Sequence, residues 1–204
     1  MLEWKFSNEC VDYLAAEKFM VKRVDDIISN EKSELIWMLE HNNIYTLGTS
    51  SNPSDFLKPS KIPSYKTKRG GQITYHGPGQ RIVYLLIDLR NKERDVKRFV
   101  WMVEEWIIEV LKEIGITGFR ISGLVGIWVE DKNSKNRDGS FHFKIASIGL
   151  RLRKWVTYHG LSLNVNPNLK YFENIVPCGV RDKGVTSIEK ILGNFCSNEI
   201  DHLF

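Results

Sequence analysis

The strongest constraint on the fold is an amphipathic segment between Asp95 and Ile114. Apolar residues recur there at steps of three and four, so they form one stripe along a helix. Gly115 follows as a natural stop. The residues of the stripe are Val96, Phe99, Val100, Val103, Trp106, Ile107, Val110, Leu111 and Ile114. Because an apolar helix stripe must pack against another element, the segment predicts a layered domain rather than an extended chain.

The rest of the chain mixes strand and helix patterns. Residues 11–29 suit a second amphipathic helix, whereas residues 35–39 and 81–89 are short apolar runs typical of buried strands. Further strands are expected at 126–130 and 141–156, joined as a hairpin by a polar loop. There are no internal repeats. These patterns predict one domain over residues 1–204, of the α+β (mixed α/β) class.

Composition narrows the cellular setting. Apolar residues make up 42% and charged residues 26%, which is ordinary for a soluble globular protein. No apolar run approaches the roughly 20 residues that span a bilayer, and the N-terminal residues lack the apolar stretch of a signal peptide. Cys10, Cys178 and Cys196 are too few and too scattered for a disulfide framework or a structural zinc site. We therefore expect a cytoplasmic protein with no membrane and no metal.

Charge gives one local clue. A net charge of +4, with acidic and basic residues spread along the chain, does not indicate a nucleic-acid binder. One segment is purely basic, with Lys58, Lys61, Lys66, Lys68 and Arg69 and no acid. It is either a solvated loop or a docking patch for an acidic protein.

Several common catalytic signatures are missing from the sequence. There is no GxSxG elbow, no GxxxxGK[ST] phosphate loop, no GxGxxG and no HExxH. Their absence argues against the usual serine hydrolases, P-loop nucleotide enzymes and zincins.

Three other segments combine chemistry with unusual backbone. The glycines of RGGQITYHGPGQ (69–80) suit either a tight turn or close approach of a ligand near His76. In FHFKIASIG (141–149), strand alternation puts Phe143 and Lys144 on opposite faces; such a lysine either points to water or belongs to a site. Cys178 lies between Pro177 and Gly179 and is either an inert thiol or an exposed nucleophile.

Together these segments resemble the lipoyl(octanoyl) transferase family. RGGQITYHGPGQ is followed in order by KIASIG (144–149), HGLSLNV (159–165) and PCGVRDKGVTS (177–187), with a weaker match at EHNNIYTLG (40–48). The resemblance covers roughly residues 34–192. The departures are small: Ser162 stands where alanine is common, and Asn42-Asn43 where prolines are common.

The resemblance implies a fold, a reaction and a site. The fold would be that of the biotin and lipoate protein ligase catalytic domain, a mixed β-sheet covered by helices. The reaction would move octanoyl from octanoyl-acyl carrier protein to a lysine of lipoyl-accepting domains, the first step of endogenous protein lipoylation, without ATP or metal. The acceptors would be the acyltransferase subunits of 2-oxoacid dehydrogenases and the glycine-cleavage H protein.

By the same resemblance, Cys178 would form the thioester intermediate and Lys144 would lower its pKa. The residues implied in substrate binding are Arg69, Gly70, Gly71, Gln72, Ile73, Thr74, Tyr75, His76, Ser147, Ile148, Gly149, Gly160, Leu161 and Ser162. Glycines among them would leave room for the acyl chain.

Two alternatives stay open. An ATP-dependent lipoate or biotin protein ligase shares the fold but has no need of a cysteine in a PCG turn. A non-catalytic module could bind lipoyl domains or acyl carrier protein without forming a covalent adduct.

Overall fold

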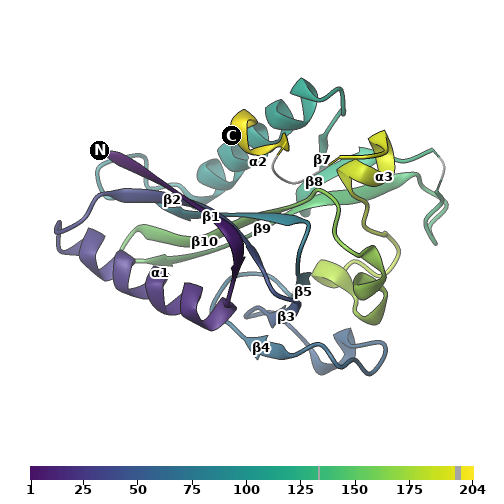
Figure 1. Cartoon of the computed structure of the whole chain (residues 1–204), viewed down its shortest axis with the longest axis horizontal. Helices are drawn as coiled ribbons and strands as arrows, with labels where there is room; N and C mark the ends of the chain where they lie inside the picture. The colour runs from purple at the N-terminus through teal and green to yellow at the C-terminus, as the bar shows by residue number, and fades with distance from the viewer. Residues whose placement is uncertain (133, 196–198) are drawn as a thin grey trace.

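The computed structural model describes residues 1–132, 134–195 and 199–204, with only the backbone described at Cys178 (Figure 1). Cys196 lies outside the described residues. Within the described part, no helix is long and apolar enough to cross a membrane.

A seven-stranded mixed sheet forms the centre of the molecule, in the order β1-β2-β6-β10-β9-β8-β7. The strands are β1 (Leu2–Val11), β2 (Glu34–His41), β6 (Gln80–Leu86), β7 (Phe119–Ile121), β8 (Leu124–Glu130), β9 (His142–Arg153) and β10 (Val156–Asn164). The β1–β2 pair is parallel and the other neighbours are antiparallel. The strands expected at 35–39, 81–89 and 126–130 are thereby confirmed.

The two predicted helices cover opposite faces of this sheet. α1 (Tyr13–Ile28) lies below it in Figure 1 and α2 (Val96–Glu113) lies above it. Successive residues of β2 point to opposite faces of the sheet, so Leu35 packs with α1, whereas Ile36 packs with α2. Each helix begins at an aspartate whose carboxylate accepts a backbone N–H. The core is therefore two apolar layers, one on each face of the sheet.

A small second sheet stands at one end, in the order β4-β3-β5. Its strands are β3 (Ile44–Leu47), β4 (Ser64–Lys66) and β5 (Ile73–His76). The remaining short helical segments are η1 (Pro53–Asp55), η2 (Leu169–Asn174), η3 (Pro177–Gly179), α3 (Ile188–Leu192) and η5 (Asp201–Leu203). Between β3 and β5, residues 48–68 are largely irregular and contain only η1 and β4.

Two expectations need correction. The single strand expected over 141–156 is two strands, because the chain reverses at Lys154 and Trp155, both with positive φ (48° and 66°). β1 is absent from the sequence-based assignment, although Leu2, Trp4 and Phe6 alternate with polar residues there.

Candidate active site

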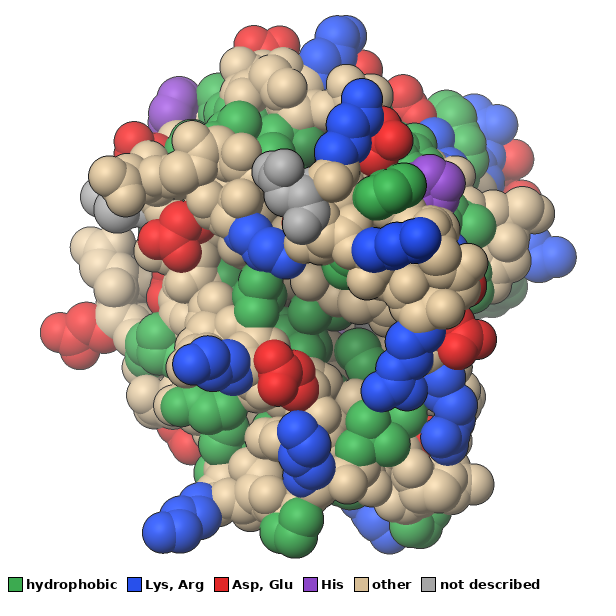
Figure 2. Space-filling model, turned by 90° about the vertical axis from the view of Figure 1, so that its right-hand side faces the viewer, with side chains coloured by type: hydrophobic (Ala, Val, Ile, Leu, Met, Phe, Trp, Pro, Cys, Tyr) green, Lys and Arg blue, Asp and Glu red, His purple; other side chains and the backbone are tan. Residues whose placement is uncertain are grey.

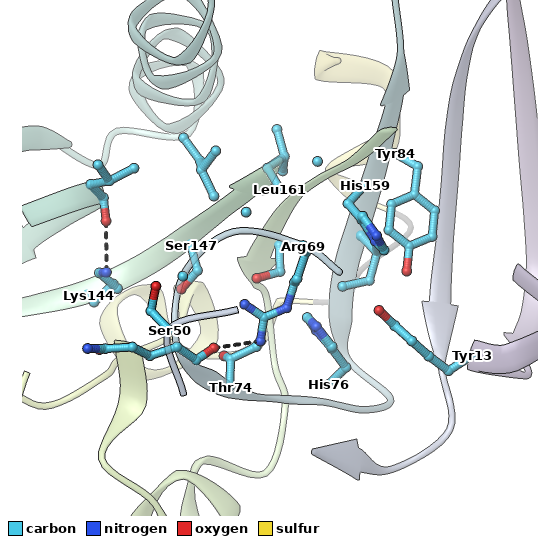
Figure 3. Close-up of a pocket in the computed structure, with 18 of the residues that line it drawn as sticks. Tyr13, Ser50, Arg69, Thr74, His76, Tyr84, Lys144, Ser147, His159 and Leu161 are labelled. Atoms are coloured by element: carbon cyan, nitrogen blue, oxygen red, sulfur yellow. Dashed lines mark hydrogen bonds between the residues drawn. The ribbon is translucent and has the colours of Figure 1, made fainter. Parts of the chain in front are cut away.

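A cavity of about 310 Å³ opens where the two sheets meet (Figure 3). β5, β6, β9, β10 and the glycine-rich segment before β5 supply most of its wall. Its lining residues are Tyr13, Ser50, Arg69, Gly71, Gln72, Thr74, His76, Ile82, Tyr84, Gly123, Val125, Lys144, Ser147, Ile148, Gly149, His159, Gly160, Leu161 and Ser162. The structure thus brings the segments 69–76, 144–149 and 159–162, far apart in the sequence, around one space.

Lys144 lies at one end of this cavity and is buried, with only 4% of its surface exposed. Its Nζ donates a hydrogen bond to the Val125 carbonyl oxygen at 2.8 Å and lies 5.0 Å from the centre of the Trp128 ring. The interpretation of Lys144 as a solvated strand lysine is therefore wrong. An amine held in this way has a fixed position at the cavity wall.

Gly126 makes room for this amine. Its φ is +112°, and a Cβ there would lie 2.5 Å from the Ala146 carbonyl oxygen and 3.2 Å from Cε of Lys144. The register of β8 against β9 shifts at the neighbouring residues, between Ile127 and Trp128. The Val125 carbonyl that binds the Lys144 amine therefore lies beside an irregular part of the β8–β9 ladder.

The backbone of Lys144 also binds the segment that follows the PCG turn. Its N–H donates to the Gly184 carbonyl at 3.0 Å, and its carbonyl accepts from the Thr186 N–H at 2.9 Å. The side chain of Cys178 is outside the described part of the structure. Its neighbour Gly179 has φ +70°, and a Cβ there would overlap the Gln72 amide, which lines the cavity. The PCG backbone therefore lies against Gln72, a residue of the cavity wall.

Arg69 is buried and organises the glycine-rich wall. Its guanidinium donates to the Thr46 carbonyl at 2.6 Å, to the Thr46 hydroxyl at 2.9 Å and to the Gln72 carbonyl at 2.8 Å. The two contacts with Thr46 tie the segment to β3. Arg69 is only 8% exposed, so it is not part of the surface basic patch expected from the sequence.

The residues expected on β5 divide between its two faces. Thr74 and His76 line the cavity, whereas Ile73 and Tyr75 point away from it into an apolar cluster with Tyr45. This division follows from strand alternation. Of the fourteen residues implied in binding, Gly70 also does not line the cavity; its N–H donates to the Leu150 carbonyl.

His76 is held as a neutral imidazole. Its Nδ1 donates to Gln80 Oε1 at 2.6 Å, and the Gln80 amide donates in turn to Asn164 Oδ1 at 2.8 Å. Burial, reinforced by His41 and Arg69, lowers the pKa of His76 to about 3. The ring therefore carries no charge near neutral pH.

The end of the cavity opposite Lys144 is aromatic and polar (Figure 3). The His41 Nδ1 lies 2.7 Å from the Val11 carbonyl, so His41 Nε2 accepts the Tyr84 hydroxyl at 2.6 Å. His159 has φ +57° and is 2% exposed, and its Nε2 has no hydrogen-bond partner among the described residues. Burial also lowers the pKa of His159 to about 3.

Tyr13 and Tyr84 were missed as lining residues, because each lies in an apolar pattern that predicts only core packing. His159 opens the HGLSLNV motif, so the sequence contained a signal for it. Gly160 lines the cavity, but a Cβ there would lie 2.0 Å from the Val83 carbonyl. Glycine at this position therefore permits close strand packing rather than room for a ligand.

The described residues contain no group of three or more His, Cys, Asp or Glu side chains placed to hold a metal ion. The cavity has the Lys144 amine at one end and neutral rings at the other. Such a wall suits an elongated, uncharged ligand.

Solved structures of proteins from lipoylation systems have a similar fold. A bipartite lipoate protein ligase from Thermoplasma acidophilum, described with its E2 lipoyl domain, aligns with a TM-score of 0.69 over 100% of this chain and 80% of its own, at 13% identity. P. falciparum LipL1 in complex with lipoate aligns with a TM-score of 0.69 over 100% of this chain and 58% of its own, at 14% identity. The likeness confirms the α+β fold expected from the sequence.

The family follows from closer matches. The family model described as the lipoyl protein ligase A/B catalytic domain matches residues 11–202. Proteins named octanoyltransferase are similar along most of the chain: one from Paramagnetospirillum magneticum is 48% identical over 92% of this chain and 85% of its own length. Another, from Bartonella tribocorum, is 46% identical over 91% of this chain and 77% of its own. The chain belongs to the lipoyl protein ligase A/B catalytic domain family.

Proposed function

We propose that this chain is an octanoyltransferase of protein lipoylation that holds the acyl group as a thioester on Cys178. The donor is octanoyl-acyl carrier protein, and the acceptor is a lysine of a lipoyl-accepting protein. Relatives named octanoyltransferase support the acyl transfer. The observation that supports the mechanism is the buried Lys144 amine, which is fixed on the Val125 carbonyl in a cavity whose wall residue Gln72 lies against the PCG backbone.

The first half-reaction is a thioester exchange. The Cys178 thiolate, favoured by a neighbouring Lys144 ammonium, attacks the donor carbonyl carbon. The bond from that carbon to the donor sulfur breaks, and the departing thiolate takes a proton from Lys144. The products are an octanoyl-Cys178 thioester, a neutral Lys144 amine and the free carrier thiol.

The second half-reaction forms the amide. The neutral amine of the acceptor lysine attacks the Cys178 thioester, and Lys144 takes the proton that this nitrogen loses. The Cys178 thiolate then leaves, which regenerates the starting pair of thiolate and ammonium. Each step trades one acyl bond for another, so the cycle consumes no nucleotide.

The cavity offers an apolar wall for the acyl chain of the substrate. Lys144 and Val125 mark the reacting end, while Ile82, Ile148 and Leu161 add apolar wall further along. A saturated eight-carbon acyl group needs an apolar channel about 10 Å long at roughly 1.3 Å per carbon, in the manner of other ligand sites. The neutral state of His76 and His159 is consistent with an uncharged tail.

The exposed basic residues have a place in this scheme. Lys58, Lys61, Lys66 and Lys68 are all exposed, at the end of the molecule that carries the small sheet. On the face drawn in Figure 2, Lys and Arg side chains lie on both sides of a hollow that contains hydrophobic side chains. Complementary charge of this kind would speed the approach of an acidic carrier or acceptor domain.

The decisive experiment is intact-protein mass spectrometry after incubation with octanoyl-acyl carrier protein, without ATP. The wild type should gain one octanoyl group that hydroxylamine removes, and Cys178→Ala should gain none. Cys10→Ala is the matched control and should acylate normally. No adduct in any of them, with transfer only when ATP is supplied, would identify a ligase reaction instead.

A further inference from the structure

One edge of the large sheet is open. β1 pairs with β2 along one side, in regular register from Leu2 to Phe6, with a shift between Phe6 and Cys10. On the other side, no strand of the described chain pairs with β1. The segment Leu2–Phe6 therefore presents a short, regular row of backbone donors and acceptors to its surroundings.

The open edge of β1 carries exposed apolar side chains, although edge strands are normally protected against pairing with another strand. Leu2, Trp4 and Phe6 are 41%, 43% and 54% exposed. The Trp4 and Phe6 rings stack at 6.2 Å, and Trp4 also meets the α2 residue Trp106 edge-on at 6.2 Å. Natural proteins usually shield such an edge with proline, a bulge or inward charges, because it pairs readily with another strand.

The exposed surface continues beyond the strand. A groove of about 640 Å³ lies beside β1 and is lined by Leu2, Phe99, Met102 and Trp106, among others. Met102 on α2 is itself 53% exposed. Contiguous apolar surface of this kind marks an interaction site.

The other face of the same segment carries opposite charges. Glu3 forms an ion pair with Arg23 of α1, and Lys5 lies 4.7 Å from the Phe19 ring centre and 4.8 Å from that of Trp37. Both side chains therefore lie over α1, on the face opposite Leu2, Trp4 and Phe6. Glu3 and Lys5 flank Trp4 symmetrically in the sequence.

We propose that a second copy of this chain pairs with β1 in antiparallel fashion, with Trp4 opposite Trp4 on a two-fold axis. In this register Glu3 lies opposite the partner's Lys5, and Lys5 lies opposite the partner's Glu3. Leu2 lies opposite the partner's Phe6 on the other face. A two-fold interface must be self-complementary, and this five-residue segment is so in both charge and apolarity.

Neighbouring registers are disfavoured by the same residues. A slip of two residues one way puts Glu3 opposite Glu3, and a slip the other way puts Lys5 opposite Lys5. Like charges directly opposite each other destabilise an antiparallel pair. The sequence therefore favours one register and discourages the two beside it, which a randomly exposed edge would not do.

Charge exchange tests the register directly. In a sedimentation-velocity concentration series the wild type should dimerise, whereas Glu3→Lys and Lys5→Glu should each raise the dimer Kd about tenfold or more, because both symmetric pairs become repulsive. Lys18→Glu, an equal charge change at an exposed position of α1, should leave the Kd unchanged. Circular dichroism would verify that every variant is folded.

Two restorations complete the test. The double variant with Glu3→Lys and Lys5→Glu should dimerise again. An equimolar mixture of the two single variants should form heterodimers, because each supplies the charges that the other lacks. A wild type that stays monomeric throughout the series would overturn the proposal. So would single variants that dimerise like the wild type, or folded samples in which both the double variant and the mixture remain monomeric.

Discussion

The Nζ of Lys144 lies 2.8 Å from the carbonyl oxygen of Val125 and 5.0 Å from the centre of the Trp128 ring. Val125 and Trp128 both belong to β8, so this strand fixes the position of an amine that lies on the neighbouring strand, β9. The proposed reaction uses this amine. The position of the amine matters for the proposed reaction, because a misplaced amine cannot reach the proton that it must move.

Removal of this amine should abolish acyl transfer while the fold survives. Lys144→Met keeps the length and apolar stem of the side chain, and we expect its rate to fall by about 10²- to 10⁴-fold, the usual contribution of a proton-transfer group. Steady-state octanoyl transfer would measure this. Lys170→Met, at an exposed lysine, is the control and should keep the wild-type rate. A Lys144→Met enzyme with wild-type turnover would rule out the assigned role.

Gly179 should be intolerant of any side chain for a reason beyond its backbone angle. A Cβ at Gly179 overlaps the Gln72 amide, and φ is +70°. Gly115 has φ +79° with nothing within 4 Å of its Cβ position, so Gly115→Ala should lose only about 1 kcal/mol of stability, with activity retained. Gly179→Ala should displace the PCG turn and lose most activity. Thermal melts would measure the loss of stability, and transfer rates would measure the loss of activity. Equal losses of activity in the two variants would contradict the predicted effect of the contact between Gly179 and Gln72.

The buried histidines should make stability fall in mild acid. The pKa is lowered by burial to about 4 for His41 and to about 3 for both His76 and His159. Histidine in the unfolded chain has a pKa of about 6.5, so below this pH the unfolded chain binds protons that the folded chain does not bind. The free energy of unfolding therefore decreases as pH falls from about 6.5 toward 3. Each group contributes up to about 1.4 kcal/mol per pH unit within that window.

Urea denaturation at pH 7, 6 and 5 would measure this slope. His76→Gln should flatten it, whatever its effect on stability at pH 7. His202→Gln is the control, because His202 is exposed, and it should leave the slope unchanged. Unfolding free energies that stay level between pH 7 and 5 would show that these rings are protonated as readily in the fold as outside it.

Charge reversal in the basic segment should weaken encounter with acidic partners. Lys66→Glu with Lys68→Glu should raise the carrier-protein KM several-fold at low ionic strength and reduce its dependence on salt, since exposed charges act chiefly on the rate of association. Kinetics at two salt concentrations would measure both. Lys18→Glu with Lys97→Glu provides an equal charge change at exposed positions on the helices. Equal KM changes in the two pairs would mean that net charge matters and this location does not.

The wall at Gly149 should control acyl-chain length. A Cβ there would lie 3.2 Å from the Gly70 carbonyl oxygen and 3.3 Å from Cδ of Arg69, so Ala fits only tightly and Val requires displacement. We expect Gly149→Val to lower octanoyl kcat/KM by about tenfold or more relative to butanoyl, in line with the cost of one or two methylenes in an apolar pocket. Gly149→Ala should shift the preference less. An unchanged ratio between the two donors would place the chain elsewhere.

Sequence patterns predicted the framework well where the periodicity was long. The stripes of α1 and α2 and the apolar runs of β2 and β6 all form the expected elements. The reversal at Lys154 and Trp155 escaped prediction, because both residues adopt positive φ without the glycine that normally signals it. Tertiary packing imposes that turn, and local preference does not.

The site divides in a similar way. The motifs singled out Lys144 and the glycine-rich segment, and the structure brings both to the wall of one cavity. Alternation on β5 separates Thr74 and His76 from Ile73 and Tyr75, a division that requires knowledge of which face is which. Tyr13 reaches the cavity only through the docking of α1 on the sheet, and no local pattern encodes that.

The two backbone hydrogen bonds that join Lys144 to Gly184 and Thr186, one donated by Lys144 and one accepted by it, have a mechanical consequence. The chain that leaves Cys178 is anchored, a few residues later, to the very residue that supplies the amine. A displacement of β9 along its axis would therefore pull on the segment that follows the PCG turn. In the proposed reaction, this link would help to keep Cys178 and Lys144 aligned while the protein substrates bind and dissociate.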